Sequence, residues 1–156
     1  MYSIVSEKDI NVEEEDTKQA DVYNDETENT GITKSNDAVS FGIDVSAWQK
    51  EIDWEKVKAA GVKFVIIRCG YRGAKTGALV EDSYFYKNLQ GAKDAGIDVG
   101  VYFFTQALNE TEAVEEASMV LALLGDTELE YPIFIDTENT NGRADGLDKN
   151  TRTQVC

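Results

Sequence analysis

The sequence predicts an α/β fold in which parallel strands alternate with helices, as in a TIM-like (β/α) barrel. Apolar runs of strand length recur along the chain, and segments with apolar residues at helical spacing separate them. The connections are short, which favours parallel strands joined by right-handed crossovers, with the helices outside. Polar and aromatic residues stand at the carboxyl ends of these strands, and a barrel of this kind builds its site on that rim.

The first half of the predicted domain contains two strands and one helix. The first strand covers residues 41–46. Asp53 is placed to cap a helix that starts at Trp54 and stops at Gly61. The second strand covers residues 62–68, and the stretch that follows it, 70–80, is predicted to be a loop because it contains several glycines.

The second half continues the alternation. A helix is predicted over residues 82–95 and a strand over residues 98–104. Asn109, with Glu112 three residues later, resembles a capping box and opens a third helix, which Gly125 stops. The apolar stripe of this helix would consist of Ala113, Ala117, Val120, Leu121 and Leu124. After a fourth strand, Asp148 is expected to cap one more helix.

The fourth predicted strand ends in two acids. Residues 133–135 are an apolar run of the kind that a strand buried on both faces needs, and Asp136 and Glu138 follow at once. Because side chains in a strand alternate, both acids would point the same way. Apolar surroundings and mutual repulsion would let one stay ionised while the other keeps its proton, as acid-assisted glycoside cleavage requires. The alternative is a solvated strand end that carries acids.

Composition narrows the possible functions. The chain of 156 residues has a net charge of -15 and no histidine. The acid excess disfavours nucleic acid and anionic membranes as partners, and no apolar run is long enough to span a bilayer. The lack of histidine excludes Ser-His-Asp and Cys-His catalysis and disfavours a zinc site. The two cysteines make no disulfide framework, and Cys69 is expected to be a buried thiol.

Two regions differ in character. Residues 1–40 are acidic and polar, without an apolar period, and are predicted to be a disordered linker or tail. Residues 41–156 form the predicted folded domain. The N-terminus shows no basic stretch followed by an apolar segment, so any export signal would lie upstream.

Several residues near the strand ends suit a glycan ligand. Asp44 and Arg68 follow the first and second apolar runs. Arg68 is equally compatible with a structural ion pair and with a substrate contact. Aromatic rings match the flat C–H faces of sugars, and four are candidates: Trp48, Tyr71, Tyr102 and Phe104. Trp48 and Tyr71 are the stronger candidates because they fall in predicted loops, whereas the other two could belong to the core.

Together these residues resemble the glycoside hydrolase family 25 lysozymes, the Chalaropsis-type muramidases. The resemblance runs from Phe41 to about Glu138, in the same order and spacing. The matching stretches are 42–46 with Gln49, 52–54, 64–68 with Gly70 and Tyr71, 88–96, 100–102 and 132–138.

This resemblance implies an extracellular or wall-associated enzyme that cleaves the β-1,4 bond between N-acetylmuramic acid and N-acetylglucosamine in peptidoglycan. It implies Glu138 as the general acid, with Asp136 stabilising the positive intermediate and Asp44 completing the acidic site. It implies no metal or organic cofactor, and a monomer when the protein is intact. One departure is Phe103, where the family often carries histidine.

Length is the second departure. About four βα units fit into the predicted domain, whereas a complete barrel needs roughly 200 residues or more. We therefore expect the N-terminal portion of a catalytic domain, truncated at its C-terminus. Two alternatives follow: an inactive sugar-binding or barrel-completing fragment of such an enzyme, and a related hydrolase of another polysaccharide.

Overall fold

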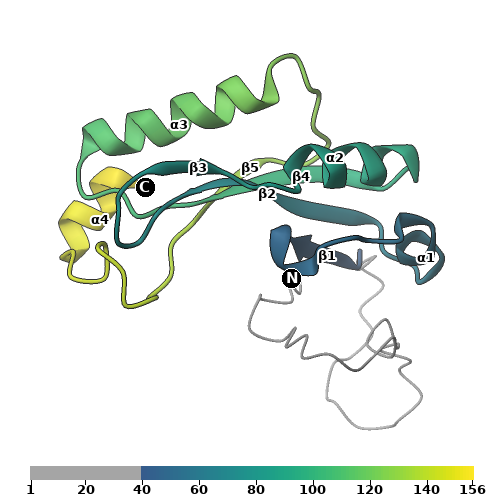
Figure 1. Ribbon diagram of the computed structural model, residues 1–156, viewed down its shortest axis with the longest axis horizontal. Helices are drawn as coiled ribbons and strands as arrows, with labels where there is room; N and C mark the ends of the chain where they lie inside the picture. Colours follow the sequence, from purple (N-terminus) through teal and green to yellow (C-terminus); the bar gives the residue numbers. More distant parts are fainter. Residues whose placement is uncertain (1–39) are drawn as a thin grey trace, which may run out of the picture.

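The computed structural model describes residues 40–156 (Figure 1). The linker predicted at 1–40 lies, except for its last residue, outside these residues. The sheet has the strand order β1-β2-β4-β5. These strands are β1 (Gly42–Val45), β2 (Phe64–Arg72), β4 (Asp98–Phe104) and β5 (Ile133–Asp136), and each pairs with its neighbours in parallel. The predicted α/β class with a parallel sheet is confirmed.

The helices begin where their capping residues predict. Asp53 accepts a hydrogen bond from the Lys56 amide at the start of α1 (Trp54–Ala59), and Asp148 accepts two amides at the start of α4 (Lys149–Val155). Asn109 caps α3 (Glu110–Leu124). The capping box there is only half formed, because the Glu112 carboxylate accepts from the Leu108 amide, one residue earlier than a capping box requires.

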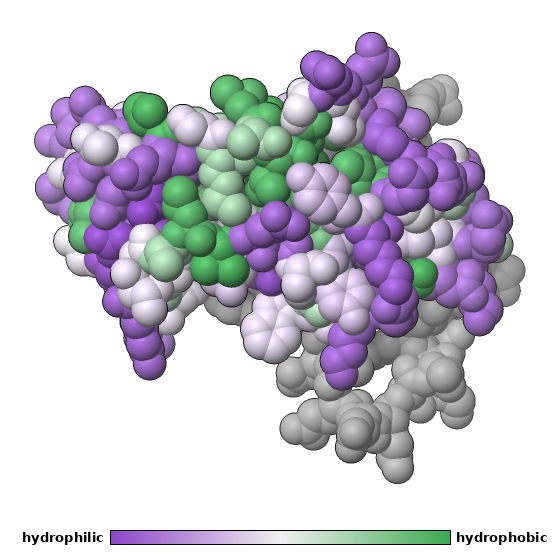
Figure 2. Space-filling view, turned by 45° about the horizontal axis from the view of Figure 1, so that its top comes forward, coloured by the Kyte–Doolittle hydropathy of each residue, from purple (hydrophilic) through white to green (hydrophobic). Residues whose placement is uncertain are grey.

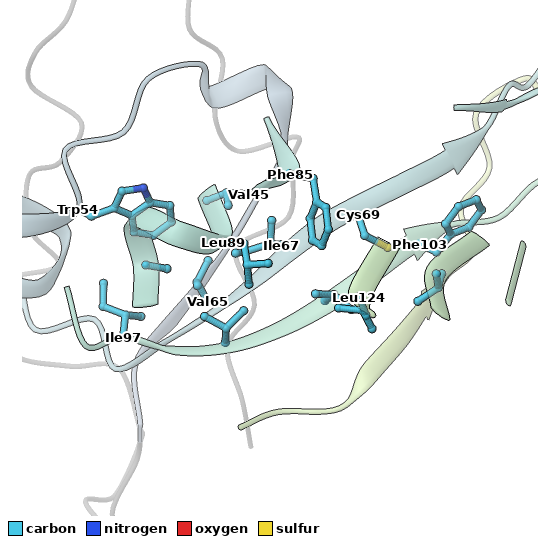
Figure 3. Packing of buried hydrophobic residues seen from close by; sticks show 14 of the residues in the cluster. Val45, Trp54, Val65, Ile67, Cys69, Phe85, Leu89, Ile97, Phe103 and Leu124 are labelled. Atoms are coloured by element: carbon cyan, nitrogen blue, oxygen red, sulfur yellow. The ribbon is translucent and has the colours of Figure 1, made fainter. Parts of the chain in front are cut away.

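The main core lies between the sheet and the helices. In Figure 1, α3 and α2 (Phe85–Asp94) lie on the same side of the sheet. Residues at alternate positions of β2 and β4 point to that side, among them Val65, Ile67 and Val101, which have no or almost no exposed surface. Phe85 of α2 is fully buried and lies beside Cys69 of β2 (Figure 3).

The stretch 70–80, predicted as a loop, is mainly a β-hairpin. β2 continues to Arg72 and turns into β3 (Leu79–Glu81), which pairs with it in antiparallel fashion. The register of β2 against β4 shifts between Arg68 and Gly70, so one extra residue is accommodated. Cys69 belongs to the main core, and its predicted burial is confirmed. Burial raises the pKa of this thiol to about 12.

The bounds and faces of two helices also differ from the prediction. α2 begins at Phe85 rather than near residue 82. The Asp82 side chain accepts the Tyr84 amide, two residues later, and residues 83 and 84 form a turn before the helix. On α3, Leu121 is 65% exposed, whereas Glu116 is buried. Glu116 forms an ion pair with the buried Arg72 of β2, and this contact sets the face that α3 presents to the sheet.

The apolar run of β5 is not buried on both faces, contrary to the prediction. Ile133, Phe134 and Ile135 are 45%, 37% and 52% exposed. The physical reason is that β5 is the last strand of the sheet and pairs with β4 on one side only. On the face of the molecule that is seen in Figure 2, hydrophobic residues gather near the middle. No helix within residues 40–156 is both long and apolar enough to cross a membrane.

Candidate active site

Most of the predicted site residues share the face of the sheet that lies opposite α2 and α3, which we call the inner face. Paired residues of neighbouring strands point to the same side, so the register places each of them. Arg68, Tyr102 and Phe134 form one row, and Tyr71, Phe104 and Asp136 form the next row toward the carboxyl ends. Asp44 is paired with Ile66, two residues before Arg68, and therefore lies in the preceding row of the same face.

The bulge in β2 is what gives Tyr71 this position. Without the extra residue, strand alternation would turn Gly70 inward and Tyr71 toward the helices. With it, Tyr71 pairs with Phe104 on the inner face, and the Arg68 guanidinium lies 5.3 Å from the centre of the Tyr71 ring. This distance suits a cation–π contact.

Toward the amino ends of the strands, the inner face carries a small apolar cluster. Phe64, Ile66 and Tyr102 are buried there, and the Tyr131 ring stacks on Phe64 with 4.6 Å between ring centres. Tyr102, only 7% exposed, therefore belongs to a core, which was one of its two predicted alternatives. Phe104, one row nearer the rim, is partly exposed and stays a candidate for a sugar contact.

Arg68 forms a structural ion pair. Its Nε donates to Asp82 Oδ2 at 2.8 Å, and both side chains are almost wholly buried. The contact with Asp82 and the contact with the Tyr71 ring together hold the guanidinium against the inner face. The ion-pair alternative is therefore confirmed, and a substrate contact for Arg68 stays a prediction.

Trp48 lies in a short 3-10 helix, η2 (Ala47–Gln49), directly after β1. The Ser46 hydroxyl accepts the Trp48 amide and the Gln49 amide, and the Gln49 side chain accepts the Ser46 amide, so the capping box is complete. The backbone of this turn is thus well held, whereas the Trp48 side chain is 69% exposed. An exposed indole on a rigid turn is suited to stack on a sugar ring.

The two acids of the fourth strand do not both lie in it. β5 ends at Asp136, and Glu138 stands two residues later in a segment without regular structure. Strand alternation therefore fixes the direction of Asp136 but not that of Glu138. The Asp136 carbonyl accepts the Thr105 amide, which ties the end of β5 to the residue after β4. Asp136 and Glu138 are both partly exposed.

The chain around Glu138 is anchored at several points. Arg152 of α4 donates to the Thr137 hydroxyl at 2.8 Å. Further on, the Ala144 amide donates to the fully buried Gln106 side chain, and Arg143 pairs with Glu112 of α3 at 2.8 Å. Partial burial of Glu112 opposes its ionisation. The hydrogen bonds from the Leu108 amide and from Arg143 have the larger combined effect, so the pKa of Glu112 is lowered. These contacts give the segment after β5 a defined position.

The arrangement can support acid–base chemistry. Carboxylates, an arginine and aromatic rings stand at the carboxyl ends of parallel strands, where parallel α/β folds bind their substrates. Within residues 40–156, no group of three or more potential metal-ligating side chains could hold a metal ion. The fold and this set of residues together define a TIM-like (β/α) fold with acidic and aromatic residues on one face of its sheet.

Comparison with known proteins gives the family. Residues 43–155 match the glycosyl hydrolases family 25, so the chain belongs to that family. It is 31% identical over 112 residues to an autolytic lysozyme from Clostridium acetobutylicum, covering 71% of this chain and 32% of that protein.

Two solved structures show the same fold. The modular autolysin LytC from Streptococcus pneumoniae superposes with a TM-score of 0.62 at 32% identity, covering 73% of this chain and 27% of that one. A family 25 glycosyl hydrolase from Bacillus anthracis gives a TM-score of 0.58 at 27% identity, covering 72% and 49%. The chain thus spans at most about a third of the curated relatives it matches.

One residue that organises the site was missed by the sequence reasoning. Asp82 was assigned to the start of a helix, yet its side chain is fully buried and binds Arg68. An acid before an aromatic helical segment looks like an ordinary helix start, so no local signal distinguishes it. Only the pairing of β2 with β3 brings Asp82 beside Arg68.

Proposed function

We propose that the protein to which this chain belongs hydrolyses peptidoglycan, cleaving the β-1,4 bond between N-acetylmuramic acid and N-acetylglucosamine. The observation that carries the proposal is the row of Tyr71, Phe104 and Asp136 on the inner face, in a chain that belongs to the glycosyl hydrolases family 25. LytC, one of the structural relatives, has also been solved with a synthetic peptidoglycan ligand.

In this proposal Glu138 is the general acid. A glycosidic oxygen is a poor leaving group, so a positioned acid has to protonate it as the bond breaks. The strand end and the anchored segment behind it would hold Glu138 near the sugar. Asp136 and Asp44 would stabilise the positive charge that develops on the ring, and a site with little water would strengthen that effect.

The aromatic residues would align the glycan. Trp48 presents an exposed indole, and Tyr71 and Phe104 are partly exposed on the inner face. Sugar rings stacked on these side chains would run along the rim toward Asp136. The location that fits such a substrate is the cell wall or the extracellular space, and no cofactor is proposed.

The test is the clearing of a suspension of purified peptidoglycan. The variant Glu138→Gln keeps the shape of the side chain but cannot donate the proton, and general acid catalysis contributes about 10²–10⁴-fold. We introduce the variant into the protein to which this chain belongs, and we expect the rate of clearing to fall by at least about 100-fold. A matched control is Glu128→Gln, an exposed acid before β5. Retained activity in Glu138→Gln would refute the role of Glu138.

A second function is favoured by one observation. The apolar residues of β5 are exposed, and the strand pairs on one side only. Such an edge is a template for pairing with a further strand. The chain by itself would then be a sugar-binding or barrel-completing fragment without activity. A folded chain that binds N-acetylglucosamine oligomers but releases no product from peptidoglycan would favour this reading.

A further inference from the structure

Asp82 has three hydrogen-bond donors from three separate parts of the fold. Its side chain has 0% relative exposure. Oδ2 accepts from Arg68 Nε of β2 at 2.8 Å and from the Ala47 amide of η2 at 2.9 Å. Oδ1 accepts from the Tyr84 amide, directly before α2, at 2.9 Å. One carboxylate therefore joins the turn after β1, the middle of β2 and the start of α2.

Two of these partners lead to the residues that we propose bind the glycan. Ala47 is the neighbour of Trp48 in η2, and Arg68 lies over the Tyr71 ring. Trp48 follows β1 and Tyr71 lies in β2, so the two belong to different parts of the chain. Asp82 is the buried group that holds the backbone beside one of them and the cation against the other.

The capping box of η2 does not replace this contact. Ser46 and Gln49 satisfy donors within the turn, and they fix its internal shape. The bond from the Ala47 amide to Asp82 crosses 35 positions of sequence, and through Asp82 it joins the turn to Arg68 of β2. A charged acceptor in a buried setting makes such bonds stronger than neutral ones.

We propose that Asp82 is a positioning residue that sets the spacing of Trp48, Arg68 and Tyr71 along the sugar-binding rim. This deepens the proposed function and rests on it for the identity of the ligand, an N-acetylated glycan. Asp82 takes no part in proton transfer in this proposal, because its side chain is fully buried and its oxygens accept from Arg68, Ala47 and Tyr84.

The variant Asp82→Asn tests the proposal. Asparagine is isosteric but uncharged, and it has one acceptor oxygen instead of two. At least one of the three donors therefore faces an NH₂ group, and the bonds that remain, that of Ala47 included, lose the charge assistance that makes them strong. The matched control is Glu116→Gln. It perturbs a different buried arginine–carboxylate pair, Arg72 with Glu116, whose side chains have 4% and 7% relative exposure. That pair lies between β2 and α3.

The readout is amide hydrogen exchange in the full chain, followed by NMR. We expect exchange at the Ala47 amide to become at least about 10-fold faster in Asp82→Asn, which corresponds to about 1.4 kcal/mol. The Arg68 Nε–H signal should also lose its protection. Neither site should change in Glu116→Gln beyond the effect of global stability. Unchanged exchange at Ala47, or an equal change in both variants, would overturn the proposal.

Two further measurements keep the proposal testable. In the unaltered chain, the Ala47 amide should exchange at least about 100-fold more slowly than an open turn, since burial of Asp82 protects the bond. An unprotected Ala47 amide would refute the proposal even if Asp82→Asn does not fold. Titration with N-acetylglucosamine oligomers, followed by Trp48 fluorescence in a Trp54→Phe background, should show at least 5-fold weaker binding in Asp82→Asn than in Glu116→Gln. An unaltered chain that does not bind would count against the proposed function, whereas the exchange data would still decide the role of Asp82.

Discussion

The buried Arg72 should be among the costliest side chains to remove. Its guanidinium donates to Glu116 Oε1 at 2.7 Å, to Glu115 Oε2 at 3.0 Å, and to the carbonyls of Gly77 and Glu112 at 2.8 and 2.9 Å. These bonds join the β2–β3 hairpin to α3. The variant Arg72→Met keeps an unbranched side chain about as long as the aliphatic stem of arginine and removes the charge and every donor.

The magnitude follows from the group that is left behind. Glu116, with 7% side-chain exposure, would become a buried carboxylate without its cation. Breaking one half of a buried ion pair typically costs about 3–5 kcal/mol. Protonation limits the charge part, because an ordinary glutamic acid titrates near pH 4.3, so neutralising it at pH 7 costs about 3.7 kcal/mol. Near pH 4.5 this part almost vanishes, and about 1–2 kcal/mol from lost hydrogen bonds remains.

Urea unfolding followed by tryptophan fluorescence measures this difference at pH 7 and at pH 4.5. We expect Arg72→Met to lose about 3–5 kcal/mol at pH 7 and clearly less at pH 4.5. The double variant Arg72→Met with Glu116→Leu should recover much of the loss. Lys56→Met is the control, because its ion pair with Asp53 is exposed to solvent and contributes little to stability. A loss below 1 kcal/mol at pH 7, or one that does not shrink on acidification, would refute the reasoning.

Three further predictions concern the core and the titratable groups. Phe85→Ala should lower the free energy of unfolding by about 3–5 kcal/mol, since this ring is fully buried, whereas Tyr86→Ala, at a half-exposed ring, should cost much less; urea titrations compare them. Iodoacetamide at pH 8 should modify the exposed Cys156 quickly and Cys69 only on unfolding, because burial raises the pKa of Cys69 to about 12; mass spectrometry of peptides reads this out. The Val99 amide donates a hydrogen bond to Glu130, and this bond, with a smaller contribution from the charge of Lys93, lowers the pKa of Glu130 below its ordinary value of 4.5. The stabilisation that this carboxylate provides is therefore present at neutral pH and is lost as the pH falls below that value. Glu130→Gln should therefore reduce the loss of stability between pH 6 and pH 3.

Each of these has a result that contradicts it. Equal losses in Phe85→Ala and Tyr86→Ala would contradict the burial of the Phe85 ring. Modification of both thiols at the same rate in the folded chain would contradict the burial of Cys69. A Glu130→Gln variant with the acid sensitivity of the unaltered chain would show that this carboxylate is not held by its partners.

The parts of the fold that depend on neighbouring residues could be predicted from the sequence. Asp53, Asn109 and Asp148 cap their helices because a carboxylate or amide there reaches an amide two or three residues later. The strand at residues 98–104 was predicted with the bounds that the structure has. The strand order of the sheet follows from parallel alternation with short connections.

What could not be predicted depends on distant contacts. The β2–β3 hairpin is held by Arg72, whose partner Glu116 lies 44 positions away in sequence. The exposure of Ile133, Phe134 and Ile135 depends on where β5 falls in the sheet rather than on its composition. Apolar character alone had suggested a strand covered on both faces.

The candidate site shows the same division. The rows that contain Arg68, Tyr102 and Asp136 were expected from the positions of strand ends, and the register confirms that these side chains share a face. The position of Tyr71 depends on a bulge that leaves no clear mark in the sequence. Asp82 belongs to the site because of its contacts with Arg68 and the Ala47 amide, which lie 14 and 35 positions away in sequence. No local pattern in the sequence predicts such contacts.

The most direct test of the proposed function is the identity of the reducing end that appears in digested peptidoglycan. Purified wall is treated with the active protein and then with borohydride, which converts each new reducing sugar to its alditol, and the alditols are identified by mass spectrometry. The proposal predicts the alditol of N-acetylmuramic acid with the unaltered protein, and a loss of at least about 100-fold with Glu138→Gln. The alditol of N-acetylglucosamine, or equal yields from both proteins, would contradict it.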